Sequence, residues 1–145
     1  MADVKQAVAV WQSDLAFEGR ANSNIPVMMD GRSKVGVSPV EMVLLGLAGC
    51  AGGDVIDILQ KKRQQVTGLE VQVTGRRAEE HPRKYTAIEV NYVVTGHAID
   101  PNAVARAIEL SETTYCSVSA TVRGVASITS RYEIRDAEMA PAQLF

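Results

Sequence analysis

The order of the expected secondary structure elements predicts an α+β fold. Strands fill the first thirty residues, one long helix follows, and a pair of alternating segments then precedes a second helix and a last strand. Strands and helices grouped in this way, rather than alternating one by one, are typical of α+β proteins. The 145 residues contain no linker and no internal repeat, so we expect a single domain over residues 1–145. Residues 137–145 are expected to form a loose C-terminal tail.

The first thirty residues are expected to form short strands. Apolar runs begin at Val8 and at Leu15, with turn-forming residues between them, and Gly19 is expected to mark a bend. Residues 25–29 are a further candidate strand, and the dipeptide Asp30-Gly31 predicts the turn that ends it.

The clearest helix begins at residue 39. Ser38 stands at the N-cap, Pro39 at the first helical position and Glu41 at the third, which together form a capping box with a preset start. The helix is expected to run to about residue 63, a length of roughly 37 Å. Its first half is apolar on every side, which is typical of a helix buried all round.

Four glycines in this helix indicate a close neighbour. Gly46, Gly49, Gly52 and Gly53 each cost about 1 kcal/mol relative to alanine. Small residues at such positions usually allow another backbone to pass very near. We therefore expect this helix to cross a second helix tightly at the centre of the molecule, and we expect an obligate homodimer, because one chain cannot easily surround it.

The second half of the chain supplies the remaining elements. Residues 69–73 and 85–94 alternate as two strands, and the polar residues 76–84 are expected to link them as a hairpin loop. Asp100-Pro101 predicts the start of a second helix, followed by a short break at residues 111–115. Residues 117–123 could be helical, and residues 126–134 alternate as a last strand.

Composition and charge exclude several classes of function. The net charge of −2 offers no electrostatic reason to bind nucleic acid. The apolar stretch 40–58 contains Glu41, Asp54 and Asp57, which argues against a membrane span. The first six residues are polar and lack a signal core, so we expect a cytoplasmic protein.

The two cysteines lie 66 positions apart, at Cys50 and Cys116. This spacing matches neither a zinc pattern nor the disulfide framework of a secreted protein, and no metal or cofactor is expected from it. In a reducing cytosol both should be mostly thiols, and any bond between them should be transient. His81 and His97 lie in expected polar loops without partners at ligand spacing, so we expect both at the surface.

Both cysteines stand in motifs that resemble those of a known family. Residues 38–50, which end at Cys50, resemble the first cysteine motif of the OsmC/Ohr family. Residues 107–111 and 115–118, around Cys116, resemble the second. The motifs occur in the family's order, and the likeness covers about residues 5–135. It implies antiparallel sheets wrapped around two central helices in an intertwined homodimer.

The resemblance also implies a chemistry, the reduction of organic hydroperoxides in oxidative or osmotic stress. In the family the first cysteine attacks the hydroperoxide and becomes a sulfenic acid, and the second resolves it as a disulfide. By position, Cys50 would be the peroxidatic residue and Cys116 the resolving one. Lipoylated proteins reduce the disulfide in the better-known branch of the family, so a dithiol of this kind is an expected partner.

One position departs from the peroxidase branch, which carries a Glu directly after the helix-opening Pro. That Glu holds an arginine that stabilises the thiolate. Here the position is Val40, and Glu41 is rotated by about 100° from it. Gly19-Arg20 offers the candidate arginine, and Arg32 is an alternative. Arg20 and Glu41 are thus candidate site residues, although Glu41 could serve only as a cap. The pattern resembles the less-characterised branch and predicts slow peroxidase chemistry.

Other interpretations remain open. A cysteine in an apolar helix is most often a core residue, although two cysteines in two motifs favour redox chemistry. The chain could be a non-enzymatic module that binds an apolar small molecule at the dimer interface, with the cysteines as sensors. A purely structural disulfide is disfavoured by the cytosol. Asp54 and Asp57, one helical turn apart, are expected to mark the emergence of the helix into solvent or to bond a neighbouring loop.

Overall fold

The structure is a computed structural model that describes residues 2–138. The expected tail lies outside the described residues from residue 139 onward. The chain divides into two compact units, Met1–Val43 and Leu44–Phe145, which are described separately.

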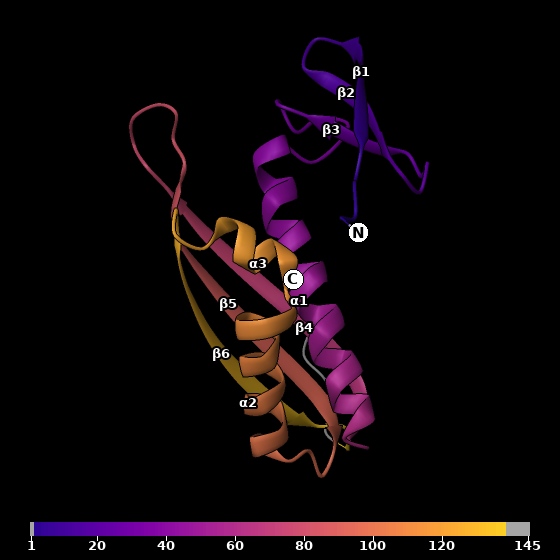
Figure 1. Cartoon of the computed structure of the whole chain (residues 1–145), viewed down its shortest axis with the longest axis vertical. Helices are drawn as coiled ribbons and strands as arrows, with labels where there is room; N and C mark the ends of the chain where they lie inside the picture. Colours follow the sequence, from indigo (N-terminus) through magenta and orange to yellow (C-terminus); the bar gives the residue numbers. More distant parts are fainter. Residues whose placement is uncertain (1, 139–145) are drawn as a thin grey trace. The chain divides into compact units, whose positions relative to one another are not determined.

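The first unit is built on a three-stranded antiparallel sheet. Its strands are β1 (Ala7–Ser13), β2 (Ala16–Ala21) and β3 (Val27–Asp30), in the order β1-β2-β3 (Figure 1). The bend expected at Gly19 is wrong, because Gly19 lies inside β2 and pairs with its neighbours in β1 and β3. The chain turns instead near Asp14 and Asn24, whose φ angles of 46° and 59° are left-handed. Asp and Asn adopt this conformation more readily than most residues.

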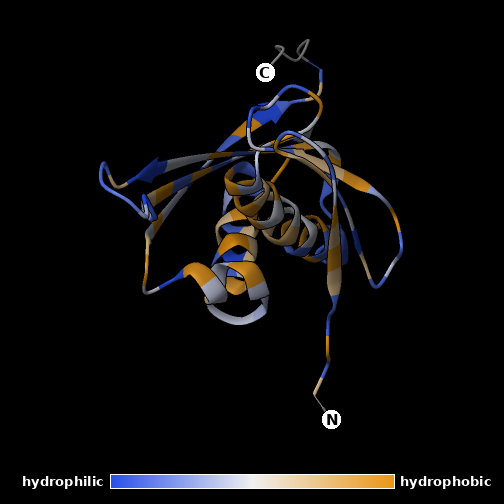
Figure 2. Cartoon of the chain, turned by 90° about the horizontal axis from the view of Figure 1, so that it is seen from above, coloured by the Kyte–Doolittle hydropathy of each residue, from blue (hydrophilic) through white to orange (hydrophobic). Residues whose placement is uncertain are grey.

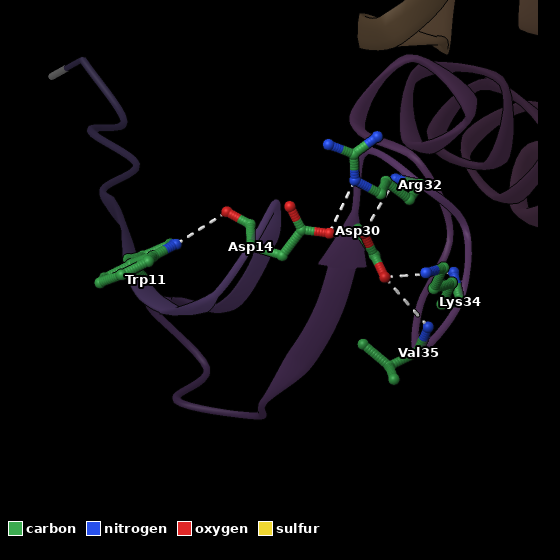
Figure 3. Close-up of polar contacts among 6 residues, drawn as sticks. All are labelled: Trp11, Asp14, Asp30, Arg32, Lys34 and Val35. Carbon is green, nitrogen blue, oxygen red and sulfur yellow. Dashed lines mark hydrogen bonds and ion pairs between the residues drawn. The ribbon is translucent and has the colours of Figure 1, made fainter.

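The loop after β3 is organised by the carboxylate of Asp30, as Figure 3 shows. This carboxylate accepts hydrogen bonds from the backbone N–H groups of Arg32 at 2.8 Å, Lys34 at 3.1 Å and Val35 at 3.2 Å. The bond from Arg32 contributes most to holding the pKa of Asp30 below its usual value. The turn predicted at Asp30-Gly31 is confirmed.

The long helix α1 (Pro39–Lys61) begins as predicted. The N–H of Ser38 donates to Glu41 Oε1 at 2.9 Å, and the N–H of Glu41 donates to Ser38 Oγ at 3.2 Å, which confirms the capping box. The helix ends two residues before the expected point. Arg63 has a left-handed φ of 58°, and the N–H of Gln64 donates to the carbonyl of Leu59, an arrangement that terminates helices.

The second unit contains a sheet of two long strands and a third beside them. These are β4 (Gln65–Arg77), β5 (Tyr85–His97) and β6 (Ser127–Asp136), in the order β4-β5-β6. β4 and β5 form the expected antiparallel hairpin, but β6 pairs parallel with β5. The expectation that the sheets are antiparallel throughout is therefore wrong for the pairing of β6 with β5. The helices between β5 and β6 return the chain to the end of the sheet at which β5 begins, as a parallel pair requires.

Three short helical segments connect β5 to β6. α2 (Pro101–Leu110) is capped by Asp100, whose carboxylate accepts from the N–H of Asn102 at 2.9 Å. A π-helical turn, η1 (Ser111–Tyr115), follows where a break was expected, and α3 (Ser117–Val122) begins directly after Cys116.

One hydrophobic core joins the helices and strands of the second unit. Its buried residues come from α1, β5, α2 and the segment around Cys116; among them are Leu47, Val55, Leu59, Tyr92 and Val104. Hydrophobic residues are spread along the helices and strands (Figure 2). By length and composition alone α1 could cross a membrane, but these contacts identify it as the core helix of this unit.

Within a single chain α1 is not buried on every side, and burial of this helix by a second chain stays a prediction. A Cβ added at Gly46, Gly49 or Gly53 would meet no atom of the described residues within 4 Å, and Leu45 is 54% exposed. Only at Gly52 does a neighbour approach, where an added Cβ would lie 3.0 Å from Val71 Cγ2. The open glycines are all on a helix that the sequence predicts to be covered by a second chain.

Candidate functional site

The two cysteines meet inside the second unit, as their motifs predict. Cys50 lies on α1 and is half-buried, whereas Cys116 lies between η1 and α3 and is only 3% exposed. Their sulfur atoms are within 4.8 Å of each other, and both are free thiols. A disulfide requires a sulfur separation of about 2.05 Å, so a modest movement of the side chains could join them.

A carboxylate completes this cluster. Asp54 is one helical turn after Cys50 on α1, and its carboxylate oxygen lies within 4.8 Å of both sulfur atoms. The hydroxyl of Ser111, which is fully buried at the start of η1, donates to Asp54 Oδ2 at 2.9 Å. This bond connects α1 to the segment after α2, so the expectation that Asp54 bonds a neighbouring segment is confirmed. Asp57 instead pairs with Lys61 in solvent.

The surroundings of Cys116 favour its protonated form. Burial is the main cause that raises the pKa of this thiol to about 11, and a hydrogen bond to Cys50 and the charge of Asp54 act in the same direction. The N–H of Ser119 donates to Cys116 Sγ at 3.3 Å and opposes the rise without cancelling it. At neutral pH Cys116 is therefore a protonated thiol that can donate a hydrogen bond to Cys50.

Hydrogen bonds from the backbone of Cys116 and from the side chain of Arg123 support the segment that carries Cys116. The N–H of Cys116 donates to the carbonyl of Ser111 at 2.8 Å. The guanidinium of Arg123 donates to Ser119 Oγ at 2.9 Å and to the carbonyl of Glu112 at 2.8 Å. These bonds connect η1 with α3 and the residue after it, on the two sides of Cys116.

Arg20, Arg32 and Glu41 belong to the first unit, where each has its own partners. Arg20 donates to the carbonyl of Asn24 at 2.8 Å and pairs with Glu18 at 3.3 Å. Arg32 Nε pairs with Asp14 Oδ2 at 2.7 Å, as Figure 3 shows. The capping bonds from Ser38 hold the pKa of Glu41 below its ordinary value. The assignment of Arg20 and Glu41 to the thiolate site stays a prediction.

An apolar groove of about 560 Å³ runs along the same stretch of α1, but neither cysteine lines it. Its lining combines the small residues of the helix with the start of β4: Ala48, Gly49, Gly52, Gly53, Ile56, Gln60, Val66, Thr67, Gly68, Leu69 and Val71. The groove thus includes three of the four glycines for which the sequence predicts a close neighbour, Gly49, Gly52 and Gly53.

Sequence reasoning identified the two cysteines but undervalued Asp54 and Ser111. The spacing of Cys50 and Asp54, four residues on one helix, already places them on the same face. No local signal connects either residue to Ser111, because the contact spans 57 positions of the chain.

Comparison with known proteins agrees with the motifs. A family described as OsmC-like protein matches residues 31–131. Protein YhfA of Escherichia coli strain K12 is 43% identical over 130 residues, which cover 89% of this chain and 97% of that protein.

Solved structures share the fold. A hypothetical protein from Aquifex aeolicus VF5 is 30% identical, with a TM-score of 0.85 over 93% of this chain and 98% of that one. The organic hydroperoxide resistance protein OhrB of Bacillus subtilis is 16% identical, with a TM-score of 0.60 over 90% of this chain and 98% of that one. At this identity the second likeness concerns the fold alone.

Proposed function

Because this chain belongs to the family of OsmC-like proteins, we propose that it reduces organic hydroperoxides by a two-cysteine mechanism. Cys50 is the peroxidatic residue and Cys116 the resolving residue. The observation that carries this proposal is the approach of the two free sulfur atoms to within 4.8 Å inside one unit. The hydroperoxide resistance activity named for the Bacillus subtilis protein supports the choice of substrate class.

The protonation of Cys116 supports this division of roles. A thiol with a pKa of about 11 is a poor nucleophile at neutral pH, and it is hydrogen-bonded to Cys50. Cys50 is the more exposed of the two and is the one that a hydroperoxide can approach. The thiolate of Cys50 attacks the outer oxygen of the hydroperoxide, the O–O bond breaks, and the alkoxide takes up a proton to leave as the alcohol. Cys50 is left as a sulfenic acid.

Resolution completes the cycle. The sulfur of Cys116 attacks the sulfenic sulfur, the S–O bond breaks, and hydroxide leaves with the proton of Cys116 as water. Asp54, held by Ser111, is placed to receive that proton in transit. A dithiol then reduces the disulfide by two exchange steps and is itself oxidised. We place the reaction in the cytoplasm, with a lipoylated protein as the dithiol.

The test is consumption of cumene hydroperoxide in the presence of dihydrolipoamide. The wild type should turn over, Cys50→Ser should consume nothing, and Cys116→Ser should form a sulfenic acid that mass spectrometry detects at Cys50. Peroxide treatment of the wild type should produce a peptide that links Cys50 to Cys116. Turnover that survives Cys50→Ser, or the absence of the linked peptide, would show that the two-cysteine mechanism is wrong here.

We also propose that the working protein is a homodimer. In the second unit, the open glycines Gly49 and Gly53 of α1 line the apolar groove. Within the first unit, the sheet exposes Val8, Val10 and Trp11 at 54–64%. Exposed apolar surface is typical of interaction sites, and a second copy of the chain would cover the surface of each unit. Sedimentation at micromolar concentration should give a dimer, and a folded monomer would contradict the proposal.

The groove also favours a second candidate function, a module that binds an apolar small molecule with its cysteines as sensors. Binding of a hydrophobic fluorescent probe, with no peroxide consumption, would support this candidate. Turnover that is independent of occupation of the groove would favour the peroxidase.

A further inference from the structure

Three side chains of types that commonly bind metal ions come together from two segments of the second unit. Cys50 and Asp54 lie one turn apart on α1, and Cys116 approaches from the segment between η1 and α3. Their sulfur atoms and a carboxylate oxygen all lie within 4.8 Å of one another. We propose that the reduced side chains of Cys50, Cys116 and Asp54 form a binding site for a thiophilic divalent cation of the Zn²⁺ type.

The separations suit tetrahedral coordination after a small contraction. With Zn–S bonds of about 2.3 Å and Zn–O bonds of about 2.1 Å, neighbouring ligand atoms are about 3.6 Å apart. The three atoms are therefore no more than about 1 Å too far apart on each edge. Because Cys50 is half-buried, its side chain has room for the rotation that this requires. Three protein ligands leave the fourth position to water or a small anion.

The chemistry of the three groups selects the metal. Two thiolates favour Zn²⁺ over hard cations such as Mg²⁺ and Ca²⁺, which prefer oxygen ligands. Without a cation, two sulfur atoms and a carboxylate repel each other when ionised at this separation. A divalent ion removes that repulsion, and it displaces the thiol protons as it binds.

The surrounding contacts are those of a supported site. Ser111 is fully buried and donates to Asp54 Oδ2 at 2.9 Å, which orients the carboxylate. The N–H of Ser119 donates to Cys116 Sγ at 3.3 Å, which stabilises a ligating thiolate. Hydrogen bonds of this kind to metal ligands commonly set their orientation, and their loss costs about 10–100-fold in metal affinity.

Metal binding and disulfide formation exclude each other, because both use the same two sulfur atoms. A bound cation would keep the thiols reduced and withdraw them from reaction with an oxidant. The site requires only the reduced thiols and the geometry of α1 and η1. It therefore stands independently of the proposed peroxidase activity.

The experiment titrates Zn²⁺ into the reduced, metal-free, full-length protein without oxygen, in competition with a chromophoric chelator. We expect one Zn²⁺ per chain. Asp54→Asn, Cys50→Ser and Cys116→Ser should each weaken binding by at least about tenfold, since losing a ligand costs no less than losing its supporting contact. Asp57→Asn is the matched control, because this aspartate lies on the same helix but pairs with Lys61 in solvent; its affinity should stay unchanged.

Co²⁺ gives a second readout that does not depend on activity. The wild type should show a thiolate-to-cobalt charge-transfer band and the visible bands of tetrahedral coordination, and Cys116→Ser should lose part of the former. Circular dichroism checks that each variant is folded. The absence of stoichiometric Zn²⁺ binding, or binding that Cys116→Ser and Asp54→Asn leave unchanged, would overturn the proposal even if peroxide turnover is observed.

Discussion

Raising the pH from about 8 to about 10 is expected to weaken the native state through the thiol of Cys116. Burial, assisted by Cys50 and Asp54, raises the pKa of this thiol from its ordinary value near 9 to about 11. The folded chain thus binds the proton more tightly than the unfolded chain does. The resulting stabilisation is fully present below pH 9 and is lost as the pH rises through 11.

The size of the effect follows from the two pKa values. A difference of about two pH units corresponds to about 3 kcal/mol once the pH exceeds both values. At pH 10 the unfolded thiol has lost most of its proton, whereas the folded thiol keeps nearly all of it. The free energy of unfolding should therefore fall by about 1 kcal/mol between pH 8 and pH 10 through this group alone. Cys116 is only 3% exposed, so solvent screens the effect little.

Urea unfolding with excess reductant measures this free energy at both pH values. Wild type and Cys116→Ala are compared at one protein concentration, because association would make stability depend on concentration. Lysines and tyrosines titrate in both proteins, so the difference in pH dependence isolates the thiol. An equal loss of stability in the two proteins would refute the reasoning, since it would mean that folding does not change the pKa of Cys116.

Three further substitutions test the helix, the departure from the peroxidase branch and the sheet. Gly53→Ala should stabilise an isolated chain by about 0.5–1 kcal/mol, because the added methyl meets nothing within 4 Å in the part of the chain that the structure describes; a loss of dimer in sedimentation would instead locate the partner chain at this face. We expect slow reaction of the wild type with tert-butyl hydroperoxide and a faster one in Val40→Glu, measured as second-order rates. An unchanged rate in Val40→Glu would indicate that another carboxylate already orients the arginine, as Asp14 does for Arg32 at 2.7 Å. Gly96→Ala should cost about 1–3 kcal/mol or more in urea unfolding, because its Cβ would overlap the backbone carbonyl oxygen of Gln65; unchanged stability would mean that β4 and β5 can separate at this point.

The sequence alone determined the features that depend on a few neighbouring residues. Ser38, Pro39 and Glu41 specify the start of α1 because their bonds lie within one turn. Asp100 does the same for α2. Alternation predicted the hairpin of β4 and β5 because residues of one strand face share one environment. The bend expected at Gly19 failed because glycine permits a turn without requiring one, and pairing on both sides holds it in β2.

For the site, the motif resemblance predicted that Cys50 and Cys116 belong together, but only the tertiary structure added Asp54 and Ser111. Packing of α1 and α2 against β5 in one core positions the turn after α2 beside the cysteine helix. The Ser111–Asp54 bond then joins residues 57 positions apart. Such contacts depend on how elements pack rather than on local periodicity, so no pattern of neighbouring residues contains them. The parallel pairing of β6 has the same origin, because the path of the connecting helices decides the end at which the strand enters the sheet.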